Sequence, residues 1–221
     1  MRPLPCHRAE LFRYLVKRKF IMNRFLPGIL AMAAIVVASN ILVQFPIGNW
    51  LTWGALSYPF AFLVTDVMNR VYGAAAARRV VLAGFAVGVI CSLIAAGLDK
   101  TTLRIAIGSG SAFLCAQMLD VAVFDALRNR RWWVAPLGST LVGSAVDTSL
   151  FFFIAFAATL PADGNTGWAN EMVPLLGTGA VLPLWVSLGM ADWLMKIGLA
   201  ILALVPFRII IRNFLRVYQE N

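Results

Sequence analysis

Six apolar stretches, each long enough to cross a lipid bilayer, constrain the fold of this 221-residue chain most strongly. A transmembrane helix needs about 20 predominantly apolar residues to cross roughly 30 Å of hydrocarbon. We predict spans at residues 25–46, 50–69, 79–98, 104–127, 134–160 and 180–206. The composition agrees, because 61% of the residues are hydrophobic and the mean hydropathy is +0.81. The sequence therefore predicts an all-α, polytopic membrane protein with six transmembrane helices.

The stretches favour helices over a transmembrane barrel, because they are long and continuous rather than short and alternating. Little sequence remains outside them for a separate soluble domain. We predict a basic cytoplasmic segment at 1–24, a six-helix transmembrane domain at 25–206 and a basic cytoplasmic tail at 207–221. A second interpretation of the first segment stays open, namely an upstream extension if synthesis begins at Met22.

The basic residues predict the orientation of the chain, because Lys and Arg collect in cytoplasmic segments. If the N-terminus is cytoplasmic, all but three of the 19 basic residues fall in inner segments. Lys100 and Arg104 fall outside, and Lys196 lies within the last predicted span. Both termini are therefore expected in the cytoplasm.

The net charge of +9 needs no nucleic-acid partner, since anionic lipid headgroups attract the same basic segments and no nucleic-acid-binding motif is present. The three cysteines, Cys6, Cys91 and Cys115, and the single histidine, His7, form neither a disulfide framework nor a metal-ligand spacing. We expect no cofactor and no metal. The expected partners are the bilayer and a small molecule, and a homo-oligomer stays open.

Charged residues inside the predicted spans are the main candidates for function. Asp66, Asp120, Asp147, Asp192 and Lys196 lie within spans. Each charge costs about 2.5 to 3.5 kcal/mol at the centre of a membrane helix on insertion scales. We therefore expect these side chains to face the interior of the bundle, at depths that would allow the four acids to line one cavity.

Two of these acids have a basic residue four positions later, which places both charges on one helical face. Asp192 and Lys196 form one such pair, and Asp66 and Arg70 form the other. Arg70 lies close to the predicted inner surface, so we expect it to act as an anchor there and to leave Asp66 free. Asp147 has no basic residue within a turn.

Several strings along the chain carry a family resemblance, and they read SNILVQFPI, YPFAFLVTDVMNRVYG, AFLCAQMLDVAVFDALR, RRWWVAPLGST, DTSLFFFIAF and DWLMK. In this order, from about Ser39 to Lys196, they resemble the signatures of the queuosine precursor transporter family of bacterial inner-membrane proteins. The resemblance implies a six-helix transporter that imports 7-cyano-7-deazaguanine and 7-aminomethyl-7-deazaguanine for salvage into the tRNA base queuosine. It also implies a fold shared with the substrate-binding subunits of energy-coupling-factor vitamin transporters.

The resemblance marks eight positions as family motif residues: Asn40, Asp66, Gln117, Asp120, Asp147, Thr148, Asp192 and Lys196. A deazaguanine presents adjacent ring and amino N–H donors, which one carboxylate can accept together. We therefore expect Asp147 or Asp120 to accept these donors, and Gln117 and Asn40 to contact the carbonyl side. The remaining acid would meet the aminomethyl cation or carry a proton.

The flat face of such a base stacks on aromatic rings, so Trp193 or a phenylalanine of 151–153 is expected to complete the site. An alternative function keeps the same bundle. In it the chain captures a heterocycle or vitamin and needs a separate ATP-driven partner for transport. No enzymatic activity is expected, because the G-x-G-D string of intramembrane aspartic proteases does not occur.

Overall fold

The computed structural model describes the backbone of residues 7–57, 59–161 and 166–219, and side chains within 25–214 of that part. Its described helices are α1 (His7–Leu42), α2 (Trp53–Ser57), α3 (Pro59–Tyr72), α4 (Ala74–Gly97), α5 (Leu103–Leu127), α6 (Val134–Phe156) and α7 (Leu184–Gln219). The prediction of a helical membrane protein is confirmed. Five segments of the described part are long and apolar enough to cross a membrane: Phe25–Leu42, Ala74–Gly97, Leu103–Leu127, Val134–Phe156 and Leu184–Phe214.

The second predicted span, 50–69, differs from the expectation because a short β-strand occupies its start. Of the described residues that follow, 53–57 form α2 and 59–72 form α3. The 14 residues of α3 rise about 21 Å, which is shorter than the hydrocarbon core of a bilayer.

Two short hairpins, which the sequence did not predict, lie in the loops. In one, β1 (Pro46–Ile47) pairs with β2 (Leu51–Thr52), and in the other, β3 (Met172–Pro174) pairs with β4 (Val181–Pro183). The second hairpin and the 3-10 turns Gly167–Asn170 and Leu175–Gly177 fill the long loop before α7.

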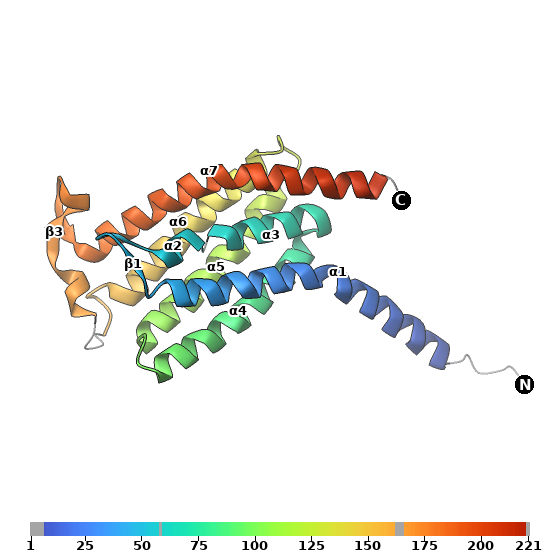
Figure 1. Ribbon diagram of the computed structural model, residues 1–221, viewed down its shortest axis with the longest axis horizontal. Helices are drawn as coiled ribbons and strands as arrows, with labels where there is room; N and C mark the ends of the chain where they lie inside the picture. The colour runs from blue at the N-terminus through green and yellow to red at the C-terminus, as the bar shows by residue number, and fades with distance from the viewer. Residues whose placement is uncertain (1–6, 58, 162–165, 220–221) are drawn as a thin grey trace, which may run out of the picture.

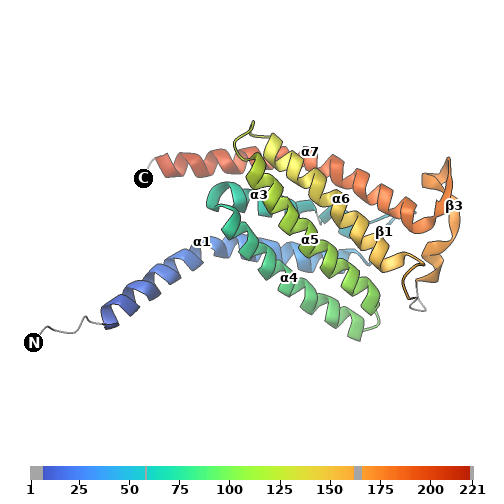
Figure 2. The same cartoon turned by 180° about the vertical axis from the view of Figure 1, so that it is seen from behind.

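The helices are arranged so that the chain starts and ends at the same end of the bundle (Figure 1). The start of α1 and the end of α7 lie at one end, and both hairpins lie at the other, which the reverse view in Figure 2 also shows. The first part of α1 projects away from the other helices. At the other terminus, α7 continues through Pro206 to Gln219, beyond the predicted end of the last span.

The bundle has an apolar side and a polar side. Between α1, α3, α4 and α5 the packing is apolar, with Met32, Ala61, Val80 and Phe113 buried together. On the other side, where α3, α5, α6 and α7 meet, most of the buried polar side chains gather. This polar side positions the candidate site.

Candidate functional site

Helix α6 presents a polar stripe to the inside of the bundle. Ser139, Thr140, Ser144, Asp147 and Thr148 are all buried, and their spacing of three to four residues places them on one helical face. The first two lie near the start of α6, and the last two lie about two turns further along. The stripe therefore meets different partners at its two ends.

One group, which we call the lysine cluster, consists of Asp147, Thr148, Asp192 and Lys196. Lys196 Nζ lies 2.7 Å from Asp147 Oδ2 and 2.6 Å from Asp192 Oδ2. Thr148 Oγ1 donates to Asp192 Oδ2 at 2.7 Å, and Lys196 Nζ donates to Thr148 Oγ1 at 3.1 Å. The predicted Asp192–Lys196 pair is confirmed, and Asp147 joins it because the fold brings α7 against α6.

The second group, which we call the carboxyl pair, consists of Asp66 and Asp120. Their carboxyl groups are buried and close enough to interact with each other. Ser139 Oγ donates to Asp66 Oδ1 at 3.1 Å, and Thr140 Oγ1 donates to Asp66 Oδ2 at 3.5 Å. Asp66 therefore has two hydroxyl donors from α6.

Asp120 differs from the other three acids. It is fully buried, yet neither of its carboxyl oxygens has a hydrogen-bond partner within ordinary distance and angle limits in the described part of the chain. One turn earlier on α5, the amide of Gln117 is also fully buried. Its oxygen accepts a hydrogen bond from Thr65 Oγ1 at 2.6 Å, while its nitrogen has no described partner. Two acceptors and one donor on one face of α5 thus lack an ordinary hydrogen bond, although the Asp120 carboxyl lies near the Ser139 and Asp66 side chains.

Unpartnered buried polar atoms cost about 1 to 3 kcal/mol each, so a native structure that keeps several of them needs a reason. Beside Asp120, the ring of Phe62 and the backbone of α6 at Gly143 pack closely. The indole nitrogen of Trp193 is a further buried donor without a described partner. Free donors and acceptors next to an aromatic ring are what a flat polar ligand requires.

Arg70 does not pair with Asp66 in the described structure. Its Nη1 donates to the backbone carbonyl of Arg128 at 2.7 Å, at the end of α5. Arg128 in turn donates to both oxygens of Asn69 and pairs with Asp125 at 3.4 Å. Arg70 thus leaves Asp66 unpaired with it, as expected, and it links the ends of α3 and α5. Its role as an anchor at the membrane surface stays a prediction.

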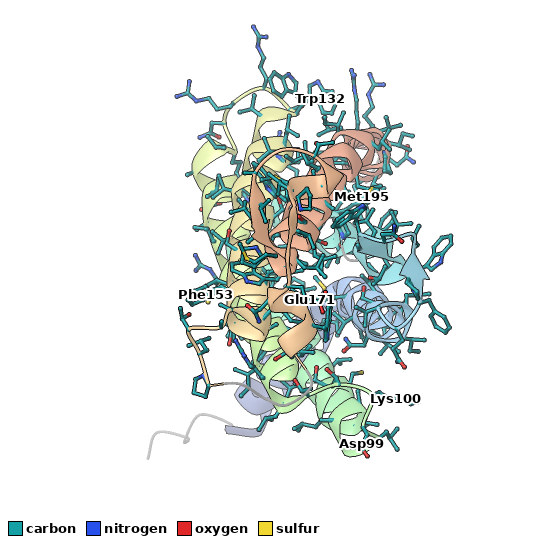
Figure 3. All side chains as sticks on the ribbon, turned by 90° about the vertical axis from the view of Figure 1, so that its left-hand side faces the viewer. Asp99, Lys100, Trp132, Phe153, Glu171 and Met195 are labelled. Carbon is teal, nitrogen blue, oxygen red and sulfur yellow. The ribbon has the colours of Figure 1, made fainter. Side chains whose placement is uncertain are left out.

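The four acids form two separate groups in the described structure. The cavity that Asp66 lines has a volume of ≈ 10 Å³. A larger depression of ≈ 860 Å³ lies at the hairpin end and is lined by Asp99 and Lys100, which Figure 3 labels, and by Arg104, but by none of the predicted site residues. That all four acids line one cavity stays a prediction.

Two predicted contributors lie apart from these groups. The Asn40 amide donates to the carbonyl of Val36 on its own helix at 2.9 Å. Phe151 and Phe152 pack with Phe156 towards the hairpin end, and Phe153 is exposed on the outside of the bundle (Figure 3).

Sequence reasoning did not identify Phe62, Thr65, Ser139 or Thr140 as neighbours of the candidate acids. Phe62 and Thr65 lie in the string YPFAFLVTDVMNRVYG, and Ser139 and Thr140 end the string RRWWVAPLGST, so the motifs contained all four of them. Only the packing of α3 against α5 and α6 shows which atoms they contact.

The chain is similar in sequence to known transporters. A family model described as "Putative vitamin uptake transporter" matches residues 52–211. The "Queuosine precursor transporter" of Escherichia coli (strain K12) is 33% identical over 200 residues, which cover 82% of this chain and 83% of that protein. The "Probable queuosine precursor transporter" of Haemophilus influenzae is 33% identical over 217 residues, which cover 84% of this chain and 85% of that protein. No solved structure is significantly similar to the chain.

Proposed function

The chain belongs to the queuosine precursor transporter family, as its motifs predicted, and from this premise we propose that it imports 7-deazaguanine precursors of queuosine. The substrates would be 7-cyano-7-deazaguanine, 7-aminomethyl-7-deazaguanine or both. The chain would sit in the bacterial inner membrane with both termini in the cytoplasm. Its relatives are named as transporters rather than enzymes.

The observation that carries this proposal is the set of free atoms on Asp120 and Gln117. A deazaguanine edge offers a carbonyl oxygen, a ring N–H and an amino N–H in a row. The two Asp120 oxygens can accept both N–H donors, and the Gln117 nitrogen can donate to the carbonyl. The donor and acceptor pattern of this helical face thus complements the base.

The sequence left open whether Asp147 or Asp120 accepts the N–H donors of the base, and in this proposal Asp120 does so. Asp147 is already bound to Lys196, whereas the Asp120 oxygens are available. Phe62, which packs beside Asp120, would supply the stacking face in place of the phenylalanines at 151–153. The lysine cluster holds two carboxylates for one ammonium, so its surplus negative charge would suit the aminomethyl cation.

A genetic experiment tests the proposal directly. Bacteria that can neither make nor import queuosine precursors would express the chain and receive each base separately. The proposal expects queuosine to return to tRNA with one or both bases. If queuosine stays absent with both bases although the protein is present in the membrane, the proposed function is wrong.

Matched variants in the same assay test the assignment of the site. Asp120→Asn and Gln117→Glu each reverse part of the donor and acceptor pattern without changing the size of the side chain. We expect each to reduce uptake about 5- to 150-fold, since a wrong polar group in a buried site costs about 1 to 3 kcal/mol. Asp125→Asn changes an exposed acid that lies between one and two helical turns after Asp120 on α5, and it should keep normal uptake. Normal uptake by Asp120→Asn would contradict the assignment.

A second candidate function is favoured by the description of the matching family model, which names vitamin uptake. In this case the chain would capture its substrate and rely on an ATP-driven partner. The purified chain in liposomes separates the two possibilities. Uptake of the base by the chain alone supports an autonomous importer, and binding without uptake supports a capturing subunit.

A further inference from the structure

We propose that the carboxyl pair is a proton-binding site that couples import to protons, with Asp66 as the carrier of one proton for each base. This inference rests on the proposed function and adds a coupling ion to it. Asp120 keeps the role of accepting the base. The two acids of the pair would thus have separate tasks.

The first argument is the charge of the buried site. Asp66 and Asp120 are 3% and 0% exposed. The 2.6 Å hydrogen bond from Thr65, next to Asp66, to Gln117, one turn before Asp120, holds their stretches of α3 and α5 together. Two neighbouring carboxylates in a medium of low polarity are both ionised only at a high cost, because desolvation and like-charge repulsion act on both. The pair therefore favours binding a proton, which Asp66 can release where water reaches it.

The basic residues nearest along the two helices do not neutralise the pair. Arg70, one turn beyond Asp66, donates to the Arg128 carbonyl, and Arg128 is held by Asn69 and Asp125. These contacts lie towards the ends of α3 and α5. Their charges are therefore directed away from the two carboxyl groups.

The other helices packed around the pair contribute no closer described cation. The charged residues of α6 and of Leu184–Phe207 in α7 are Asp147, Asp192 and Lys196, which bind one another in the lysine cluster. Further along α7, the Arg208 guanidinium lies 4.6 Å from the centre of the Trp132 ring, and Arg212 is exposed. Helix α4 carries only Arg78 and Arg79, which are both exposed, and residues 25–42 of α1 carry no charge. Arg104, at the start of α5, is bound to carbonyls at the end of α6. A proton is therefore the simplest cation for the pair.

The second argument is that Ser139 can serve both protonation states of Asp66. Its hydroxyl lies 3.1 Å from Asp66 Oδ1 and 3.3 Å from the carbonyl oxygen of Pro136. A hydroxyl donates one hydrogen and accepts others. Ser139 can donate to an ionised Asp66, or donate to Pro136 and accept from a protonated Asp66, without moving.

The third argument is that a water molecule can reach Asp66. The ≈ 10 Å³ cavity between α3, α6 and α7 is lined by both Asp66 and Thr140. This volume is close to the lower limit for a single water molecule. Water at this position would exchange a proton with Asp66, whereas the Asp120 side of the pair faces the tightly packed α5–α6 contact at Gly143.

The coupling of base import to protons follows from the separate tasks of Asp120, which binds the base, and Asp66, which binds the proton. Asp120 must be ionised to accept both N–H donors of the base, and a proton on Asp66 favours that state because it removes the neighbouring like charge. Base binding therefore favours proton binding, and by linkage proton binding favours base binding to the same degree. The proton enters from outside with the base and leaves Asp66 inside, so one neutral base and one positive charge cross together.

Liposomes containing the purified chain test this inference. With the outside one pH unit more acidic and no membrane potential, one-proton coupling should accumulate 7-cyano-7-deazaguanine up to about tenfold. A trapped pH dye should also report acidification inside when the base is added outside. Exchange of labelled for unlabelled base, measured without a gradient, reports the proposed function by itself.

These measurements separate the two hypotheses. Normal exchange without gradient-driven accumulation would overturn proton coupling and leave the importer assignment in place. Absence of exchange would overturn the importer assignment and, with it, this inference. Each result is decided on the wild-type protein, so neither depends on the folding of a variant.

Variants then test which acid carries the proton. Asp66→Asn resembles permanently protonated Asp66, so it should keep exchange and lose accumulation, and Asp66→Glu should restore accumulation at least in part. Asp120→Asn should lose exchange, and the interfacial control Asp125→Asn should keep exchange and accumulation. Accumulation by Asp66→Asn equal to that of the wild type would rule out Asp66 as the carrier.

Discussion

At the scale of single residues, the partners of an aspartate decide its role more than its depth does. Asp147 and Asp120 are both buried acids of membrane helices, and the sequence did not distinguish them. Packing gives Lys196 to Asp147 and leaves both Asp120 oxygens free. We therefore assign Asp147 to an ion cluster that joins α6 to α7, and Asp120 to ligand recognition.

Replacing Lys196 tests the structural part of this assignment. Lys196→Met would leave two buried carboxylates facing each other, and loss of one partner from a buried ion pair costs about 3 to 5 kcal/mol. Asp147→Asn keeps the 2.6 Å contact of Lys196 with Asp192, so it should cost much less. We expect the melting temperature of the purified protein to fall strongly for Lys196→Met and little for Asp147→Asn.

Lys100→Met is the matched control for this comparison, because Lys100 is exposed in the loop between α4 and α5. It should melt like the wild type. If Lys196→Met melted at the same temperature as this control, the lysine cluster would have no role in holding α6 against α7.

At the scale of elements, five of the six predicted spans correspond to long apolar helices. The apolar runs in α1, α4, α5, α6 and α7 were found because length and hydropathy alone identify them. The predicted span at 50–69 differs because a short β-strand occupies its start, before α2 and α3. The candidate acids were predictable from their cost in lipid, whereas their grouping depends on helix contacts that no local pattern encodes.

The contact between α5 and α6 makes a specific prediction at Gly143. A Cβ atom there would lie 2.9 Å from the Phe62 ring and 3.3 Å from both the Ala116 oxygen and Asp120 Cβ. Overpacking of this kind costs about 1 to 3 kcal/mol. We expect Gly143→Ala to lower both the melting temperature and the uptake of the base, because the added methyl group displaces Phe62 and Asp120.

Gly198→Ala is the matched control on α7. No atom lies within 4 Å of the position that its Cβ would take, and helix propensity favours alanine by about 1 kcal/mol. This variant should melt at the wild-type temperature or slightly higher and keep uptake. Equal behaviour of the two alanine variants would show that Gly143 is not a close-packing position.

At the scale of the whole molecule, the positions of the two chain ends determine whether the chain crosses the bundle an even or an odd number of times. The start of α1 and the end of α7 lie at the same end, so the number of passes is even (Figure 1). Five helices meet the length and hydropathy criteria, and we propose that α2 and α3 together provide the remaining pass. The short α3 would thus act as a membrane span supported by its neighbours, and it is the span that carries Asp66.

Cysteine labelling tests this topology. Glu171 lies in the exposed hairpin region at one end, and Arg130 lies in the exposed α5–α6 loop at the other (Figures 1 and 3). In a background that lacks the three native cysteines, Glu171→Cys should react with a membrane-impermeant maleimide in intact cells, because the hairpin faces outward if both termini are cytoplasmic, as proposed. Arg130→Cys should react only after the cells are permeabilised, since basic loops stay in the cytoplasm. Reaction of both positions in intact cells, or the reverse pattern, would contradict an even-pass bundle with cytoplasmic termini.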